Sequence, residues 1–192
     1  MNKILYIYDD NKISEYKYDI LEDTIIYHFS FNSSSKVLVN IMKENVSLYY
    51  YYNNINYDNN SFDIKINHNA FNTHSELFNH GVNVKDNKLN YSITSYVPNE
   101  YSKCICNQDN QIINLSDGKS TIKPNLLIDN FDVNSSHSAY IGTFKNEDMF
   151  YLMSRGISRS NCYKLLLKGF LINSRFIDVS KISDFMDKIN NI

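Results

Sequence analysis

The chain has 192 residues, a formal net charge of −2 and a composition that is 43% hydrophobic and 21% charged. This length suits one domain with a core of its own. The weak charge gives no electrostatic reason to bind nucleic acid or an anionic membrane, and no run of about 18 apolar residues could span a bilayer. Three cysteines without a paired framework, and a start that does not resemble a secretion signal, favour a cytoplasmic protein.

Short segments rich in β-branched and aromatic residues follow one another from the start of the chain, with polar turns between them. In residues 62–66, for example, apolar side chains alternate with Asp63 and Lys65, which is typical of a strand with one buried face. We predict about ten short strands, centred on residues 4–8, 24–31, 37–42, 46–52, 62–66, 74–78, 82–84, 89–93, 112–115, 121–128 and 139–141.

Two features of this strand series need an interpretation. The tyrosine run 49–52 would place two rings on each side of a strand. The asparagine-rich segment 51–60 is interpreted as a solvated turn between strands, because Ile55 and Tyr57 interrupt it.

Helical patterns occur only near the end of the chain. Asn146 is predicted to cap a first helix, which Gly156 ends in a left-handed conformation, so that Ile157 folds back on Leu152. Ser158 is predicted to cap a second helix with a broad apolar side. That side comprises Cys162, Leu165, Leu166, Leu167, Phe170 and Leu171, and a last helix over residues 179–192 places Ile182, Phe185, Met186 and Ile189 on one face.

Many strands followed by helices exclude an alternating βαβ fold. A sandwich, a barrel and a solenoid all remain compatible, because no strict repeat period is visible.

Two groups of residues could carry chemistry. His137 lies in a polar run just before a strand, and imidazole is a borderline ligand for iron. Cys104 and Cys106 would point to the same side of a strand, which suits a soft metal, yet a lone pair lacks the further ligands of a convincing metal site. The chain has no glycine-rich phosphate loop and no GxSxG or HExxH motif, so we predict that it is not an enzyme.

The blocks SHSAYIG, FYLMSRGIS and LLLKGFL occur in this order near the end of the chain. In sequence and spacing they resemble the C-terminal signature of the SufB/SufD family, the scaffold subunits of the SUF iron–sulfur cluster assembly machine. The resemblance implies a mainly β fold: a right-handed parallel β-helix (β-solenoid) core over residues 1–145 and a short C-terminal helical segment over residues 146–192. It implies a non-catalytic scaffold subunit that pairs with a second scaffold chain, an identical or a paralogous one, and docks an ABC-type ATPase (SufC).

The resemblance also implies site residues. His137 matches a histidine of the D-type subunit that is implicated in assembly, so iron or an iron–sulfur cluster would bind there transiently, with Cys104 and Cys106 as weaker candidates. Counting without gaps places Asp109 where the B-type subunit has a functional cysteine, which favours a D-like chain. The ATPase would dock on the corner formed by Leu152, Arg155, Gly156, Ile157 and Ser158.

The alternative is a free-standing β-solenoid or sandwich that binds a glycan or a protein through surface tyrosines. An enzyme would need a cleft with converging acid–base groups, which the sequence does not display.

Overall fold

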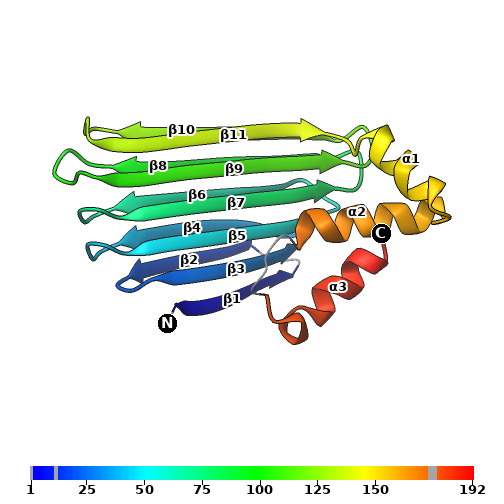
Figure 1. The fold of residues 1–192 in the computed structure, drawn as a ribbon, viewed down its shortest axis with the longest axis horizontal. Helices are drawn as coiled ribbons and strands as arrows, with labels where there is room; N and C mark the ends of the chain where they lie inside the picture. The colour runs from blue at the N-terminus through cyan, green and yellow to red at the C-terminus, as the bar shows by residue number, and fades with distance from the viewer. Residues whose placement is uncertain (1, 11–12, 173–176) are drawn as a thin grey trace.

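A computed structural model describes residues 2–10, 13–172 and 177–192 of the chain. Strands occupy the chain up to residue 142, and helices follow them (Figure 1). The strands are β1 (Lys3–Asp10), β2 (Ile13–Ile20), β3 (Thr24–Phe31), β4 (Ser34–Ile41), β5 (Ser47–Asn56), β6 (Asn60–His68), β7 (His74–Asn83), β8 (Lys88–Val97), β9 (Cys104–Asn114), β10 (Lys119–Ile128) and β11 (Val133–Gly142). The helices are α1 (Asn146–Ser154), α2 (Arg159–Leu171), the 3₁₀ turn η1 (Val179–Lys181) and α3 (Ser183–Asn190).

Consecutive strands alternate between two sheets. The odd-numbered sheet has the order β1-β3-β5-β7-β9-β11, the even-numbered sheet has the order β10-β8-β6-β4-β2, and every pairing is parallel. The chain therefore winds in coils that stack along one axis, which confirms the prediction of a β-solenoid followed by short helices. Antiparallel hairpins, which a sandwich would need, do not occur among the described strands.

The core lies between the two sheets. Inward-facing aliphatic and aromatic side chains alternate with outward-facing polar ones, as the pleat of a strand requires. Tyr50 and Tyr52 are fully buried there, whereas Tyr49 and Tyr51 lie on the outer face of the odd-numbered sheet and are half-buried. The tyrosine run thus divides between the two faces as predicted.

The asparagine-rich segment differs from its prediction. β5 continues to Asn56, and Asn54 and Asn56 are fully buried instead of solvated. Asn54 Nδ2 donates to Ser30 Oγ at 3.1 Å, and Asn56 Nδ2 donates to Asn83 Oδ1 at 3.0 Å. Neighbouring coils supply these partners, so both amide nitrogens keep a hydrogen bond although they are buried. Asn54 Oδ1 is also buried, and it has no hydrogen-bond partner among the described residues.

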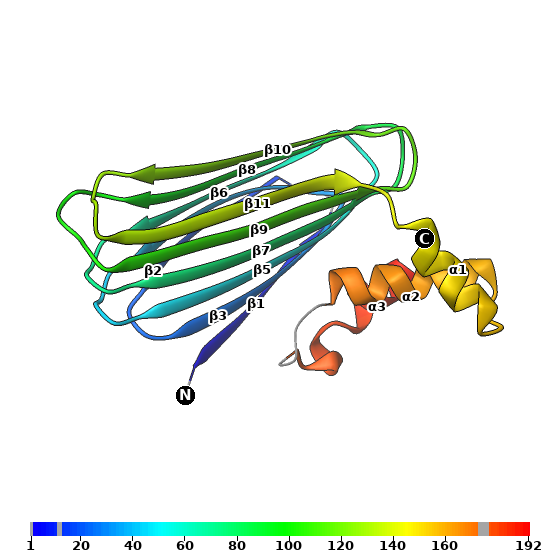
Figure 2. The ribbon, with the colours of Figure 1, turned by 45° about the horizontal axis from the view of Figure 1, so that its top comes forward.

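The helices cover part of the outer face of the odd-numbered sheet (Figure 2). A second apolar cluster forms between this face and the helices, and the predicted apolar face of the last helix contributes to it. Its fully buried members include Tyr27, Phe29, Ile55, Val82, Leu167, Leu171, Ile182, Phe185 and Ile189. Leu165 is an exception to the predicted apolar side of α2, since it is 47% exposed. Among the described residues, no helix has the length and apolarity to cross a membrane.

The corner between α1 and α2 has the predicted geometry with one change. Gly156 has φ +85°, its N–H donates to Met153 O, and the N–H of Ile157 donates to Leu152 O, as in a Schellman motif. Ser158 Oγ accepts from the N–H of Asn161 at the start of α2. Asn146, however, is the first helical residue, and Lys145 is the N-cap of α1 without a side-chain hydrogen bond. The prediction of Asn146 as the cap was wrong by one position.

Candidate functional site

His137 lies in the middle of β11, the last strand of the odd-numbered sheet. Ser136 Oγ donates to Asn107 Oδ1 and Ser138 Oγ donates to Asp109 Oδ1, both at 2.7 Å and both on the outer face. Because side chains alternate along a strand, His137 is on the opposite face, toward the axis of the solenoid. It is nevertheless exposed, because β11 pairs with β9 and with no other strand in the described part of the chain.

A buried polar residue lies directly beneath His137 in the stack. His137 pairs in register with Gln108 of β9, which is only 3% exposed. Gln108 Nε2 donates to Ser95 Oγ at 2.9 Å, while its Oε1 has no hydrogen-bond partner among the described residues. The open end of the solenoid therefore combines an exposed imidazole with a buried, unpaired acceptor in the coil below it.

Cys104 and Cys106 point to the same side of β9, as predicted, and that side is the interior. Cys106 Sγ lies 3.3 Å from His68 Nε2, and Cys104 Sγ lies 3.3 Å from Thr73 Oγ1. Thr73 Oγ1 donates to Ala70 O and accepts from His68 Nδ1, so Nε2 of this imidazole carries the lone pair.

The two thiols are poorly suited to hold a metal in this arrangement. Burial raises the pKa of Cys106 to about 12, with a further contribution from Cys104, and burial lowers the pKa of His68 to about 4. Cys106 is therefore a protonated, hydrogen-bonded thiol at neutral pH. Within residues 2–10, 13–172 and 177–192, no group of three or more His, Cys, Asp or Glu side chains could hold a metal ion.

A second titratable cluster lies inside the first coils, and no local sequence pattern indicates it. His28 Nε2 donates to Asp9 Oδ2 at 2.6 Å, and His28 Nδ1 accepts from the Tyr50 hydroxyl at 2.8 Å. Burial alone would raise the pKa of Asp9, but hydrogen bonds from His28, Ser35 and Tyr16 outweigh it and hold that pKa at about 2. Burial lowers the pKa of His28, so an ionised carboxylate and a neutral imidazole coexist there.

The predicted docking corner is an exposed elbow whose turn is held by the backbone hydrogen bonds of Gly156 and Ile157. Arg155 is exposed, and its guanidinium lies 5.3 Å from the centre of the Tyr151 ring. Large apolar side chains surround the corner in the open: Phe150 is 74% exposed and Met153 is 47% exposed. Sequence reasoning missed these two residues and the exposed Leu165, because a helical apolar pattern does not show which side of a helix packs inward.

His80 is a buried strand residue and not a surface or turn residue. It lies within β7 on the outer face of the odd-numbered sheet and is 4% exposed, packed under α2.

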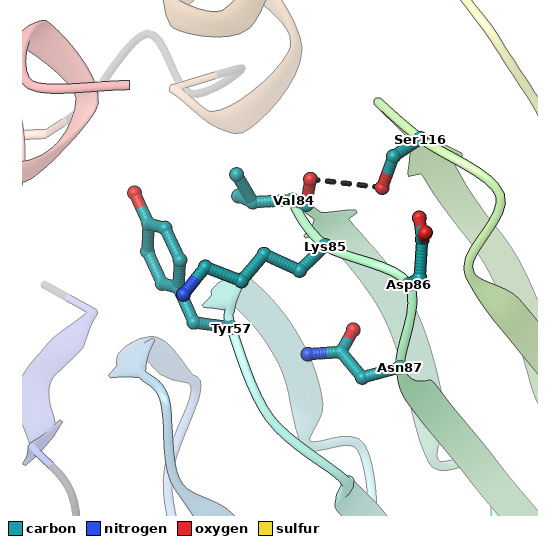
Figure 3. Close-up of a pocket in the computed structure, with 6 residues that line it drawn as sticks. All are labelled: Tyr57, Val84, Lys85, Asp86, Asn87 and Ser116. Atoms are coloured by element: carbon teal, nitrogen blue, oxygen red, sulfur yellow. Dashed lines mark hydrogen bonds between the residues drawn. The ribbon is translucent and has the colours of Figure 1, made fainter.

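A separate hollow of about 520 Å³ lies on the turns between coils (Figure 3). Lys85 Nζ is 5.7 Å from the centre of the Tyr57 ring, and Ser116 Oγ donates to Val84 O at 3.0 Å. The hollow contains neither a predicted site residue nor a histidine or cysteine. It is lined by Tyr57, Val84, Lys85, Asp86, Asn87 and Ser116.

Comparisons with known proteins point to one family. The family model described as "SUF system FeS cluster assembly, SufBD core domain" matches residues 23–170. The iron–sulfur cluster assembly protein SufD of Bacillus subtilis (strain 168) is 37% identical over 71 residues, which cover 36% of this chain and 16% of that protein. An iron–sulfur cluster assembly SufBD family protein of Pyrococcus horikoshii is 53% identical over 36 residues, which cover 19% of this chain and 8% of that protein. The matched segments thus span less than a fifth of either relative.

Proposed function

The chain belongs to the SufB/SufD family of the SUF iron–sulfur cluster assembly system, and from this premise we propose that it is a D-like, non-catalytic scaffold subunit. In this role it pairs with a second scaffold chain and docks an ABC-type ATPase of the SufC kind. It binds iron or a nascent cluster transiently, and it acts in the cytoplasm.

The position of His137 on the open end of the solenoid carries this proposal. One imidazole is a single ligand, and no set of three ligating side chains occurs among the described residues. A cluster at His137 therefore needs donors from another chain. β11 offers an exposed strand edge for such a chain, and strand edges readily pair with further strands.

The D-like assignment rests on Asp109 and on the two cysteines. Asp109 stands where the B-type thiol is expected, and hydrogen bonds from His80, Ser138 and Gln111 hold its pKa at about 2 against the effect of burial. Because Cys104 and Cys106 are buried thiols, the second scaffold chain is the better source of thiolate ligands.

The elbow between α1 and α2 is our candidate for the ATPase contact. It combines exposed apolar side chains with Arg155, whose guanidinium can bind a partner carboxylate. The Schellman motif at this corner restrains the angle between the two helices, which favours it as the element on which a moving ATPase acts.

Co-purification tests the proposal. The tagged chain is co-expressed with the ABC-type ATPase and a B-type scaffold from the same genome, and the complex is analysed by size-exclusion chromatography with light scattering. We expect all three proteins to elute together, with iron and sulfide retained after anaerobic reconstitution. Elution of the chain by itself in the presence of both proteins would contradict the proposal.

A further inference from the structure

A chain of side-chain contacts connects α2 with the strand that carries His137. The His80 ring lies parallel to the Phe170 ring, with centroids 4.7 Å apart and planes 8° apart, and His80 Nδ1 donates to the Phe170 carbonyl at 2.9 Å. On its other side, His80 Nε2 lies 3.5 Å from Asp109 Oδ2, and Asp109 Oδ1 accepts from Ser138 Oγ at 2.7 Å. We call Phe170, His80, Asp109 and Ser138 the His80 relay.

The relay is well anchored at both ends. His80 is 4% exposed and is held by ring stacking and by a hydrogen bond to the backbone of α2, so a displacement of α2 must move the ring or break these contacts. Asp109 is ionised at neutral pH, and Gln111 Nε2 also donates to it at 3.0 Å. Its Oδ1 binds the hydroxyl of Ser138, the residue adjacent to His137.

A second set of contacts on the same three strands serves as a comparison. His74 Nε2 lies 2.7 Å from Glu76 Oε1, Asn107 Nδ2 donates to Glu76 Oε1 at 2.8 Å, and Ser136 Oγ donates to Asn107 Oδ1 at 2.7 Å. This His74 relay reaches the other neighbour of His137. At its far end, His74 packs edge-on against Tyr49 of β5, and Tyr49 lies within the sheet and not on a helix.

We propose that His80 and Asp109 are positioning residues that couple the position of α2 to the orientation of the His137 side chain. A shift of α2 would move His80, weaken its contact with Asp109 and release Ser138, so that the adjacent imidazole changes its orientation. The roles of the two ends of the His80 relay rest on the proposed function. These roles are ATPase docking at α2 and cluster assembly at His137. The coupling itself is a property of the isolated chain.

The covalent connection from β11 to α1 is a second route between the same parts. It leaves the strand after Gly142, and Phe144 then packs against Phe170 with ring centroids 6.3 Å apart. This route acts on the end of β11, whereas the His80 relay acts beside His137. The two routes can therefore be separated by comparing amide hydrogen exchange at Ser138 and Ala139 with amide hydrogen exchange at Ile141.

The first test uses the isolated chain. Phe170→Leu removes the stacked ring but keeps an apolar side chain, and amide hydrogen exchange is measured along β11 with the fully buried Tyr50 as the reference for global opening. We expect exchange at Ser138 and Ala139 to rise by about threefold to tenfold, as for the loss of one typical hydrogen bond, without a rise at Tyr50.

The control is a double-mutant cycle. In the Asp109→Asn or His80→Gln background, Phe170→Leu should produce no further rise at Ser138, whereas in the His74→Gln background the rise should persist. Two relay variants are used so that one poorly folded protein does not decide the result. An unchanged exchange rate at Ser138 in Phe170→Leu, or an equal rise in the Asp109→Asn background, would overturn the inference.

The second test adds the ATPase and follows the ¹H–¹³C signal of the His137 imidazole. We expect this signal to shift on ATPase binding in the wild-type chain and in His74→Gln, and to shift by less than half as much in Asp109→Asn. A wild-type signal that does not respond to a bound ATPase would overturn the coupling, whereas an ATPase that does not bind would contradict the proposed function and leave the first test to decide the inference.

Discussion

Four of the five histidines are held by hydrogen bonds to side chains or to the backbone, and His137 is the exception. His28 and His68 are fully buried, His80 is 4% exposed, and His74 is paired with Glu76. His137 lies on an exposed strand and has no hydrogen bond within the described residues that would fix its ring. An imidazole in this position is free to bind a ligand.

Replacing His137 with alanine should impair cluster assembly and leave the fold intact. Because the side chain is exposed, we expect the free energy of unfolding to change by less than about 0.5 kcal/mol, while cluster formation in the reconstituted complex falls by roughly tenfold or more. Cys104→Ala and Cys106→Ala should show the reverse pattern, with near-normal assembly and a loss of stability of about 1 kcal/mol, because both thiols are buried. Measurements of cluster absorbance and urea unfolding on all three variants decide the assignment, which fails if the cysteine variants alone lose assembly.

The buried histidines should make the protein less stable in mild acid. His28 and His68 have lowered pKa values in the folded state, and in the unfolded chain both return to about 6.5. The unfolded state therefore binds more protons below pH 6.5, and stability falls as pH falls, by up to about 1.4 kcal/mol per pH unit for each group. The contribution of His68 to this loss of stability ends near pH 4, its pKa in the folded state. Asp9 has a pKa of about 2 in the folded state and 3.8 in the unfolded state, so its protonation lowers stability only below pH 3.8.

Urea unfolding at pH 7.5, 6.0 and 5.0 measures this dependence. A His68→Gln variant should show a shallower decline than the wild type, while His137→Ala, which removes an exposed imidazole, should not alter it. A free energy of unfolding that stays constant from pH 7.5 to 5.0 would contradict the buried neutral histidines.

At the residue scale, the sequence predicted what depends on local pattern and missed what depends on neighbouring coils. Cys104 and Cys106 share a face because they are two positions apart on one strand, and this prediction is confirmed. The contact between His80 and Asp109 joins residues that are 29 positions apart, so no local pattern could indicate it. The Asp9–His28 pair escaped prediction for the same reason, since its members are 19 positions apart.

At the element scale, strands were easier to find than to delimit. β2 was missed because Glu15, Lys17 and Asp19 make the segment look like a polar loop, although the alternate residues Tyr16 and Tyr18 face the core. β5 extends beyond its predicted end into polar residues, which neighbouring coils satisfy with hydrogen bonds. The segments 74–78 and 82–84, predicted as separate strands, belong to the single strand β7, which continues through Asn79 and His80. The helix corner was predicted well because Gly156 and Ser158 encode its geometry locally.

The elbow between α1 and α2 gives the prediction that belongs to this scale. Gly156 has φ +85°, so Gly156→Val should strain the corner by an amount on the order of 1–2 kcal/mol and change the angle between the helices. Arg155→Ala removes the exposed guanidinium without affecting the corner. We expect both variants to weaken ATPase binding, measured by calorimetry, more than Lys36→Ala on the outer face of the even-numbered sheet.

Circular dichroism confirms that each variant is folded before its affinity is compared. Unchanged ATPase affinities in both elbow variants would refute docking at this corner and would leave the scaffold assignment standing.

At the scale of the whole molecule, the solenoid has two ends, and the proposed pairing with a second scaffold chain involves only the end formed by β11. Pairing through β11 predicts that a charge beside His137 disrupts the scaffold pair. Ala139→Lys places an ammonium group on the exposed face that His137 shares, so we expect light scattering to show a shift from the paired to the single species. Ile13→Lys, at an 86% exposed position at the opposite end, should leave pairing unchanged. The reverse result would place the partner on the first coils.

The fold itself was predictable through the family resemblance and not through a repeat. Six residues in one column of the odd-numbered sheet are separated by 21, 24, 27, 31 and 29 positions along the chain; they are Lys3, Thr24, Leu48, Ser75, Cys106 and Ser135. Because the coils differ in length, the sequence has no constant period, and a solenoid could not be distinguished from a sandwich by pattern alone.

The contacts of the last helices also bear on how the chain is made. The Tyr8 hydroxyl donates to Lys181 O, Lys188 Nζ lies 2.7 Å from Asp10 Oδ2, and Phe185 packs on Phe29. Lys188 and Asp10 are 178 positions apart, so α3, which covers the first coils, is synthesised long after those coils have left the ribosome. Coils can stack one by one during translation, but Phe29 and its neighbours stay open to water until α3 has left the exit tunnel. Folding therefore ends only after synthesis has passed α3, and a chain that stalls before this helix presents an uncovered apolar surface to chaperones and proteases.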